Sequence, residues 1–62
     1  MTDEEIAAEI KRRGLEVEYL CELAASLGFD EEEGWSEAVF AAIEAATHEQ
    51  RRSAAERTLR LS

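Results

Sequence analysis

Helix-forming residues run through this chain almost without interruption. Alanine, leucine and glutamate dominate its 62 residues, proline is absent, and only three glycines occur. Such residues lose little conformational freedom in a helix, and short helices are a simple way to bury apolar surface in a small chain. A domain of this size buries only about 60% of the surface that its unfolded chain exposes, so we expect marginal stability. The sequence therefore predicts a single all-α domain over residues 1–62.

The first predicted helix, over residues 3–13, is signalled at both ends. Thr2 and Glu5 have the S/T-x-x-E spacing of a capping box, in which each side chain accepts a hydrogen bond from a backbone N–H at the helix start. Acidic residues occupy its first turn and basic residues its last, which suits the helix dipole. Gly14 suits the left-handed position that ends a helix, and Leu15 can then fold back on the last turn as in a Schellman motif.

A second helix is predicted to follow after a tight turn. Its apolar residues recur at i, i+3, i+7 and i+10, which places them on one face. This predicted buried face comprises Val17, Leu20, Ala24 and Leu27, with Leu23 beside it. Gly28 followed by Phe29 repeats the glycine-plus-apolar cap of the first helix. Two antiparallel helices joined by so short a turn form an αα-hairpin, which we predict for residues 1–29.

Residues 30–35 are predicted to form an acidic connector. Its four consecutive acids repel one another, and Gly34 weakens any helix that runs through it. We expect the third helix to start at Ser36, with Trp35 and Phe40 packed together as a hydrophobic staple. The predicted buried face of this helix comprises Val39, Ala42, Ile43 and Ala46.

Two interpretations of residues 36–62 remain open. In the first, one long C-terminal helix runs to about Leu59. In the second, the chain bends near Thr47, whose capping-box spacing with Gln50 starts a fourth helix. The apolar stripe fades in the arginine-rich tail, so we expect the tail to be helical, to bury little and to fray. The predicted architecture is a three-helix bundle, made of the αα-hairpin and this longer C-terminal helix, with a fourth helix if the bend occurs.

Negative charge is concentrated in one part of the chain. The formal net charge is −8, and residues 14–50 contain ten acids without one lysine or arginine, so this range alone is more negative than the whole chain. The remaining residues carry a small positive excess, which comes from the four C-terminal arginines. The pairs Glu18–Glu22 and Glu33–Glu37 place like charges at i, i+4, where they oppose helix formation. Like charges that are kept close together despite this repulsion favour the interpretation that the surface binds a basic partner.

We therefore predict a small acidic protein-binding module that acts as an inhibitor or regulator. Its carboxylates would replace the phosphates of nucleic acid on a basic, nucleic-acid-binding protein, as in a DNA mimic. In size and charge the chain is similar to small phage-encoded inhibitors of bacterial defence systems, such as viral anti-CRISPR proteins, and to antitoxins; the similarity is one of bulk properties, without a shared motif. The predicted partner-binding residues are Glu18, Glu22, Asp30, Glu31, Glu32, Glu33, Trp35 and Glu37, with Trp35 as aromatic anchor.

Three other interpretations stay open. The plainest is that the glutamates only keep the domain soluble. A second is a structural subunit that forms a homodimer, or joins a larger assembly, through apolar residues outside the core. The candidates for that seam are Tyr19, Phe40, Leu59 and Leu61. The third is a regulator that contacts DNA through the C-terminal arginines Arg51, Arg52, Arg57 and Arg60. A recognition helix after the Gly14 turn would face phosphates with glutamates, which disfavours major-groove binding.

No catalytic, metal or cofactor site is predicted, and an enzyme is not expected. Cys21 and His48 are the sole cysteine and histidine, whereas a zinc site needs about four such ligands and a Cys–His pair needs an orienting third group. An EF-hand loop counted from Asp30 would place Trp35 where its glycine belongs. One cysteine excludes an intrachain disulfide, and no apolar run suits a signal peptide or a membrane span. We expect a cytoplasmic protein with a free thiol.

Overall fold

The computed structural model describes residues 1–30 and 34–61, which form four α-helices. These helices are α1 (Asp3–Arg13), α2 (Glu16–Ser26), α3 (Glu37–Ala45) and α4 (His48–Leu61). No strand occurs in the described ranges. The all-α prediction is therefore confirmed, and the chain bends near Thr47 to give the fourth helix.

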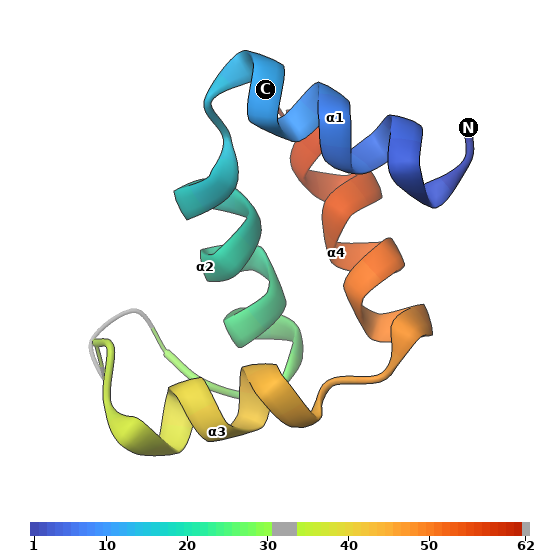
Figure 1. The fold of residues 1–62 in the computed structure, drawn as a ribbon. Coiled ribbons are helices and arrows are strands. Elements are labelled where there is room, and N and C mark those ends of the chain that lie inside the picture. Colours follow the sequence, from blue (N-terminus) through green and yellow to red (C-terminus); the bar gives the residue numbers. More distant parts are fainter. Residues whose placement is uncertain (31–33, 62) are drawn as a thin grey trace.

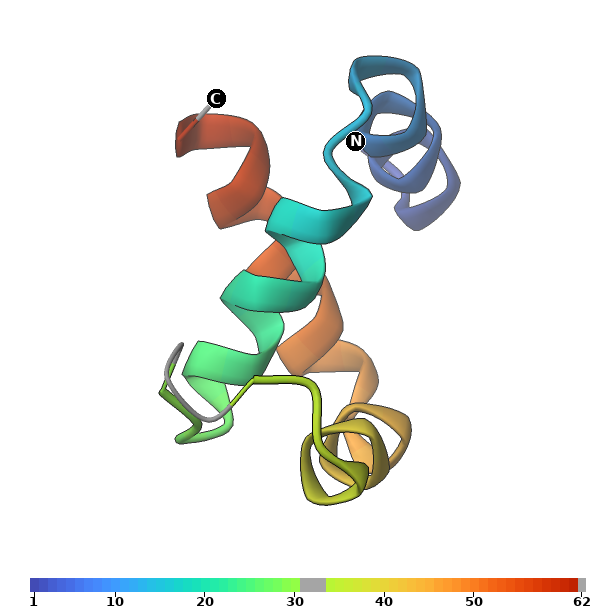
Figure 2. The same cartoon turned by 90° about the vertical axis from the view of Figure 1, so that its left-hand side faces the viewer.

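The pair α2 and α4 forms the centre of the molecule, and α1 and α3 lie across its two ends (Figure 1). Figure 2 shows α1 and α3 nearly end-on at opposite ends, with α2 in front of α4 between them. A short turn joins α1 to α2 as predicted, but α1 packs more closely on α4 than on α2. The helix pair that holds the bundle together is thus α2 with α4, two elements far apart in the sequence.

Both ends of α1 have the predicted caps. The Thr2 hydroxyl accepts a hydrogen bond from the Glu5 N–H at 3.2 Å, and the Glu5 carboxylate accepts one from the Thr2 N–H at 2.9 Å. Gly14 adopts the left-handed conformation with φ of 69°, and the Leu15 N–H donates to the Ile10 carbonyl at 2.9 Å. This pattern is the Schellman motif, which needs glycine because a side chain is strained at that φ.

The starts of α3 and α4 also follow the sequence signals. The Ser36 hydroxyl accepts a hydrogen bond from the Val39 N–H at 3.3 Å, so Ser36 is the N-cap of α3. Thr47 and Gln50 form a second capping box, with the Thr47 N–H donating to the Gln50 carboxamide oxygen at 2.9 Å and the Gln50 N–H to the Thr47 hydroxyl at 3.1 Å. These bonds satisfy backbone donors that a helix start leaves without partners.

The larger of the two apolar core clusters in residues 1–30 and 34–61 lies between α2, α3 and α4. Its buried members are Leu23, Ala24, Val39, Ile43 and Ala54, with Tyr19, Leu20, Leu27, Phe29 and Ala46 packed around them. Leu23 and Ala54 have no exposed surface at all. An alanine at the centre of a helix interface lets the two helix backbones approach closely.

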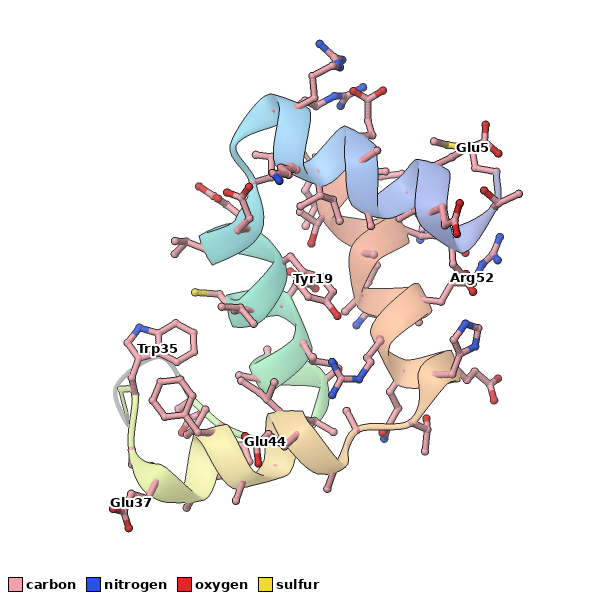
Figure 3. All side chains as sticks on the ribbon, in the orientation of Figure 1. Glu5, Tyr19, Trp35, Glu37, Glu44 and Arg52 are labelled. Carbon is pink, nitrogen blue, oxygen red and sulfur yellow. The ribbon has the colours of Figure 1, made fainter. Side chains whose placement is uncertain are left out.

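The smaller cluster holds α1 on α4. Ile6 and Ile10 from α1 are buried against Ala55 of α4, and Leu15, Tyr19 and Leu59 pack around them. Tyr19 belongs to the surroundings of both clusters and lies between α2 and α4 in Figure 3. This side chain therefore joins the two parts of a small core.

Two expectations about burial are wrong. Val17 was predicted on the buried face of α2, but 62% of it is exposed. The buried face is centred on Leu23, which leaves Val17 at its edge. The tail was expected to bury little, yet Ala54, Ala55 and Thr58 of α4 are buried. The Thr58 hydroxyl donates to the Ala54 carbonyl at 2.9 Å, so its burial leaves no unsatisfied donor.

A polar cluster, here named the Asp3 clamp, fastens the start of α1 to α4. The Asp3 carboxylate contacts the His48 ring and accepts a hydrogen bond from Arg52 at 2.9 Å. Arg52 also donates to the Met1 carbonyl at 2.7 Å and pairs with Glu56 at 2.9 Å. The hydrogen bond with His48 is the main cause that lowers the pKa of Asp3.

Replacing the central alanine, Ala54→Leu, is expected to lower the free energy of unfolding by about 1–3 kcal/mol, because the longer side chain has no space between α2 and α4. Urea unfolding followed by circular dichroism measures the change. Ala8→Leu is the matched control, since Ala8 is exposed on α1. Equal stability of Ala54→Leu and wild type would show that α4 does not pack on α2 in this way.

Asp3→Asn is expected to destabilise the fold near neutral pH and to have little effect in acid. The pKa of Asp3 is lowered below its usual value of 3.8. The Asp3 clamp therefore stabilises the fold at pH values above 3.8. This stabilisation is lost as the pH falls through the lowered pKa that Asp3 has in the folded state. Unfolding of both proteins across the acidic range measures this dependence. Glu4→Gln is the control, because Glu4 also lies in the first turn of α1 but has no ion pair with a described residue. Equal effects of the two substitutions would assign the loss to the helix dipole instead.

Candidate protein-binding site

The structure describes five of the eight predicted partner-binding residues. Glu31, Glu32 and Glu33 lie outside the described residues. Glu18 and Glu22 are on α2, one turn apart. Trp35 and Glu37 lie at the same corner of the molecule, where the chain enters α3 (Figure 3).

Glu22 is engaged within the chain. Its carboxylate accepts a hydrogen bond from Arg57 of α4 at 3.1 Å, and both side chains are about one-third exposed. Arg57 also donates to the Ser53 hydroxyl at 2.8 Å. The pair therefore ties α2 to α4, and its negative charge is offset by the protein's own arginine.

Five other acids of residues 14–50 are exposed and form no ion pair with the described residues: Glu16, Glu18, Glu37, Glu44 and Glu49. Glu18 lies in the first turn of α2, whereas Glu37 and Glu44 lie near opposite ends of α3. The exposed carboxylates are therefore spread over α2, α3 and the start of α4.

A groove of about 400 Å³ lies between α2 and the corner where the chain enters α3. We name it the Trp35 groove. It is lined by Cys21, Ala24, Ala25, Phe29, Asp30, Gly34, Trp35 and Val39. Of these residues Asp30 alone is charged, and the rest offer mainly apolar surface. Two of the predicted partner-binding residues, Asp30 and Trp35, thus meet at one concave feature.

Stacking against Phe40 holds Trp35 at the wall of this groove. The two ring centroids are 5.8 Å apart with an angle of 28° between the ring planes. This contact confirms the predicted staple across the Ser36 cap, and such aromatic pairs add about 0.5–1.5 kcal/mol beyond area burial. Even so, Trp35 is 47% exposed and Phe40 is 50% exposed. Two large rings half in water on so small a domain are a candidate contact surface.

The role of Arg51 was missed by the sequence analysis. Its guanidinium donates to the Ile43 carbonyl at 2.6 Å and to the Ala46 and Glu44 carbonyls at 3.3 Å. Helix α3 has no glycine at its end, so Arg51 satisfies the carbonyls that the last turn leaves without partners. The sequence signal that could have revealed this role is a basic residue shortly after a helix that lacks a C-terminal glycine cap.

The C-terminal arginines are therefore largely committed to the fold. Arg51 closes α3, Arg52 belongs to the Asp3 clamp, and Arg57 binds Glu22. A DNA phosphate would have to displace these contacts. The hypothesis of a DNA-contacting regulator thus has little support beyond Arg60.

The apolar residues proposed for a dimer seam do not share one surface. Tyr19 and Leu59 are half-buried against the core, whereas Phe40 and Leu61 are exposed. The exposed pair belongs to α3 and to the end of α4, which lie at opposite ends of the molecule (Figure 1). A single self-complementary seam through all four residues is therefore not present.

A second hollow, of about 300 Å³, lies where α1, α2 and α4 meet. Its floor is formed by Ile6, Ile10, Tyr19 and Ala55, and its rim includes the Asp3 clamp. Because His48 and Arg52, both from α4, bind the Asp3 carboxylate of α1 beside this hollow, we assign the hollow to the joint between α1 and α4.

Within the described part of the chain, no group of three or more histidine, cysteine, aspartate or glutamate residues could hold a metal ion. None of the helices there is both long enough and apolar enough to cross a membrane. Cys21 is an exposed free thiol.

Arg51→Met is expected to lower the free energy of unfolding by about 1–3 kcal/mol, because it keeps the apolar stem and removes the donors from the end of α3. Amide hydrogen exchange in α3 should accelerate more than in α1. Arg60→Met is the control, since Arg60 makes no ion pair with a described residue. If both variants match wild type, Arg51 does not cap α3.

No protein-family model, curated protein or solved structure matches this chain.

Proposed function

We propose that this chain is a small acidic protein-binding module that inhibits or regulates a basic, nucleic-acid-binding protein. The observation that carries the proposal is the absence of lysine and arginine from residues 14–50, a range that includes all of α2 and α3. Of the arginines of α4, Arg57 reaches this range through its pair with Glu22 and Arg51 through hydrogen bonds to backbone carbonyls at the end of α3, while Arg52 binds the start of α1. Much of the negative charge on α2 and α3 thus faces water.

Such a surface suits a partner that carries lysine and arginine for contact with phosphates. Clustered charge of one sign raises the rate of encounter with the opposite sign. Charge on an exposed surface is screened over about 8 Å at physiological salt, so the binding should weaken as salt rises.

Inhibition would follow from competition for the same basic side chains. A partner that pairs its lysines and arginines with Glu18, Glu37 and Glu44 no longer offers them to nucleic acid. In this respect the chain would act as a DNA mimic, the mode of action suggested by its likeness in size and charge to phage anti-CRISPR proteins.

Affinity capture tests the proposal. The chain is immobilised and incubated at low salt with extract of the cells from which it comes, and bound proteins are eluted with rising salt and identified. Binding of labelled nucleic acid to the eluted protein is then measured with increasing amounts of the chain. We expect a basic protein that releases nucleic acid as the chain is added. Capture of no such protein, or nucleic acid that stays bound, would overturn the proposal.

The double variant Glu18→Gln, Glu37→Gln is expected to bind the captured protein about tenfold more weakly and with a smaller salt dependence, because it removes two unpaired charges from α2 and α3. Isothermal titration at two salt concentrations measures both effects. The matched control is Glu4→Gln, Glu49→Gln, which makes the same change in net charge in the first turns of α1 and α4. Equal losses in both variants would show that only net charge matters.

A further inference from the structure

We propose that the Trp35 groove receives a bulky apolar side chain from a basic, amphipathic segment of a partner protein. This inference rests on the proposed function in one respect, the basic character of the partner. It adds the place where that partner is anchored and the kind of side chain that enters.

The lining of the groove suits an apolar group. Ala24 and Val39 are buried at its floor, and Phe29 is half-buried beside them. Cys21 and Ala25 form the α2 side with short side chains, which leaves the space between α2 and Trp35 open. A volume of about 400 Å³ accommodates a leucine or phenylalanine side chain with room to spare.

The wall opposite α2 is formed before any ligand arrives. Trp35 stacks on Phe40, and the Ser36 cap fixes the chain between the two rings. Gly34 turns the chain with φ of 66°, a conformation that favours glycine. Since the ring is held in place, less conformational entropy is lost when a partner binds it.

The charges around the groove select a basic segment. Among the described residues of its lining Asp30 is the charged one, and Glu37 follows Trp35 by two residues at the start of α3. Neither α2 nor α3 carries a lysine or arginine. A second copy of this chain would bring the same acids and be repelled, so a basic foreign segment is the better fit.

An amphipathic helix supplies both required features in one element. Its apolar face provides the anchor, and basic residues on the neighbouring turns reach the acids beside the groove. A partner surface with basic residues but no apolar anchor would pair with the acids and leave the groove empty.

Two single-copy residues of the chain report on this site. Trp35 is the only tryptophan and Cys21 the only cysteine, and both line the groove. An occupant should shift the fluorescence emission of Trp35 to shorter wavelength and protect Cys21 from alkylation.

The test compares two synthetic helical peptides of equal length and equal positive charge. One consists of leucine and lysine in amphipathic order, and the other has alanine in place of leucine. We expect the leucine peptide to bind about tenfold more tightly, to shift the Trp35 emission and to protect Cys21.

Ala25→Gln fills the groove from the α2 side without changing the charge, and Ala25 is exposed, so the fold should persist. We expect Ala25→Gln to lower the affinity for the leucine peptide to the level measured for the alanine peptide. Ala8→Gln, at an exposed site on α1 away from the groove, is the control and should bind as wild type does.

The outcomes separate this inference from the proposed function. Equal binding of both peptides to wild type, or unchanged binding of the leucine peptide to Ala25→Gln, overturns the groove as anchor site and leaves the proposal of a basic partner standing. Failure of both basic peptides to bind at low salt counts against both proposals.

Discussion

The fold depends on the close packing of α2 against α4. Leu23 and Ala54 have no exposed surface at the centre of this contact, and the next residue, Ala55, receives the two isoleucines of α1. Adjacent alanines of one helix thus anchor both core clusters. Alanine adds little hydrophobic free energy by itself, but its small size brings larger residues of α1, α2 and α3 into contact across it.

The same packing arranges the charges. With α4 against α2, Arg51 reaches the end of α3, Arg52 the start of α1 and Arg57 the side of α2, where each binds oxygen atoms. These three arginines are therefore occupied in holding helices together. Glu18, Glu37 and Glu44 have no such counterpart among the described residues, so their charges on α2 and α3 stay exposed to water although the chain contains seven basic residues.

Local features of this fold could be predicted from the sequence, and features that depend on helix pairing could not. The caps at Thr2, Gly14, Ser36 and Thr47 each involve residues within five positions, so spacing alone identified them. Which face of α4 would be buried depends on the approach of α1 and α2. Alanines carry little weight in a search for apolar periodicity, and the contribution of Ala54 was therefore missed. Arg51 was considered only as a DNA contact, and its role in closing α3 was missed because its acceptors belong to another helix.

The candidate site combines a local feature, which could be predicted from the sequence, with a feature that depends on helix pairing, which could not. The stacked pair Trp35 and Phe40 follows from the start of α3 and was predicted, because a staple requires only the spacing across a cap. A staple does not, however, require a groove beside it. The groove arises because α2 places Cys21 and Ala25, two short side chains, opposite the tryptophan. Larger residues there would cover Trp35 and improve burial. Small residues beside a fixed and half-exposed ring instead leave the space that an incoming side chain needs.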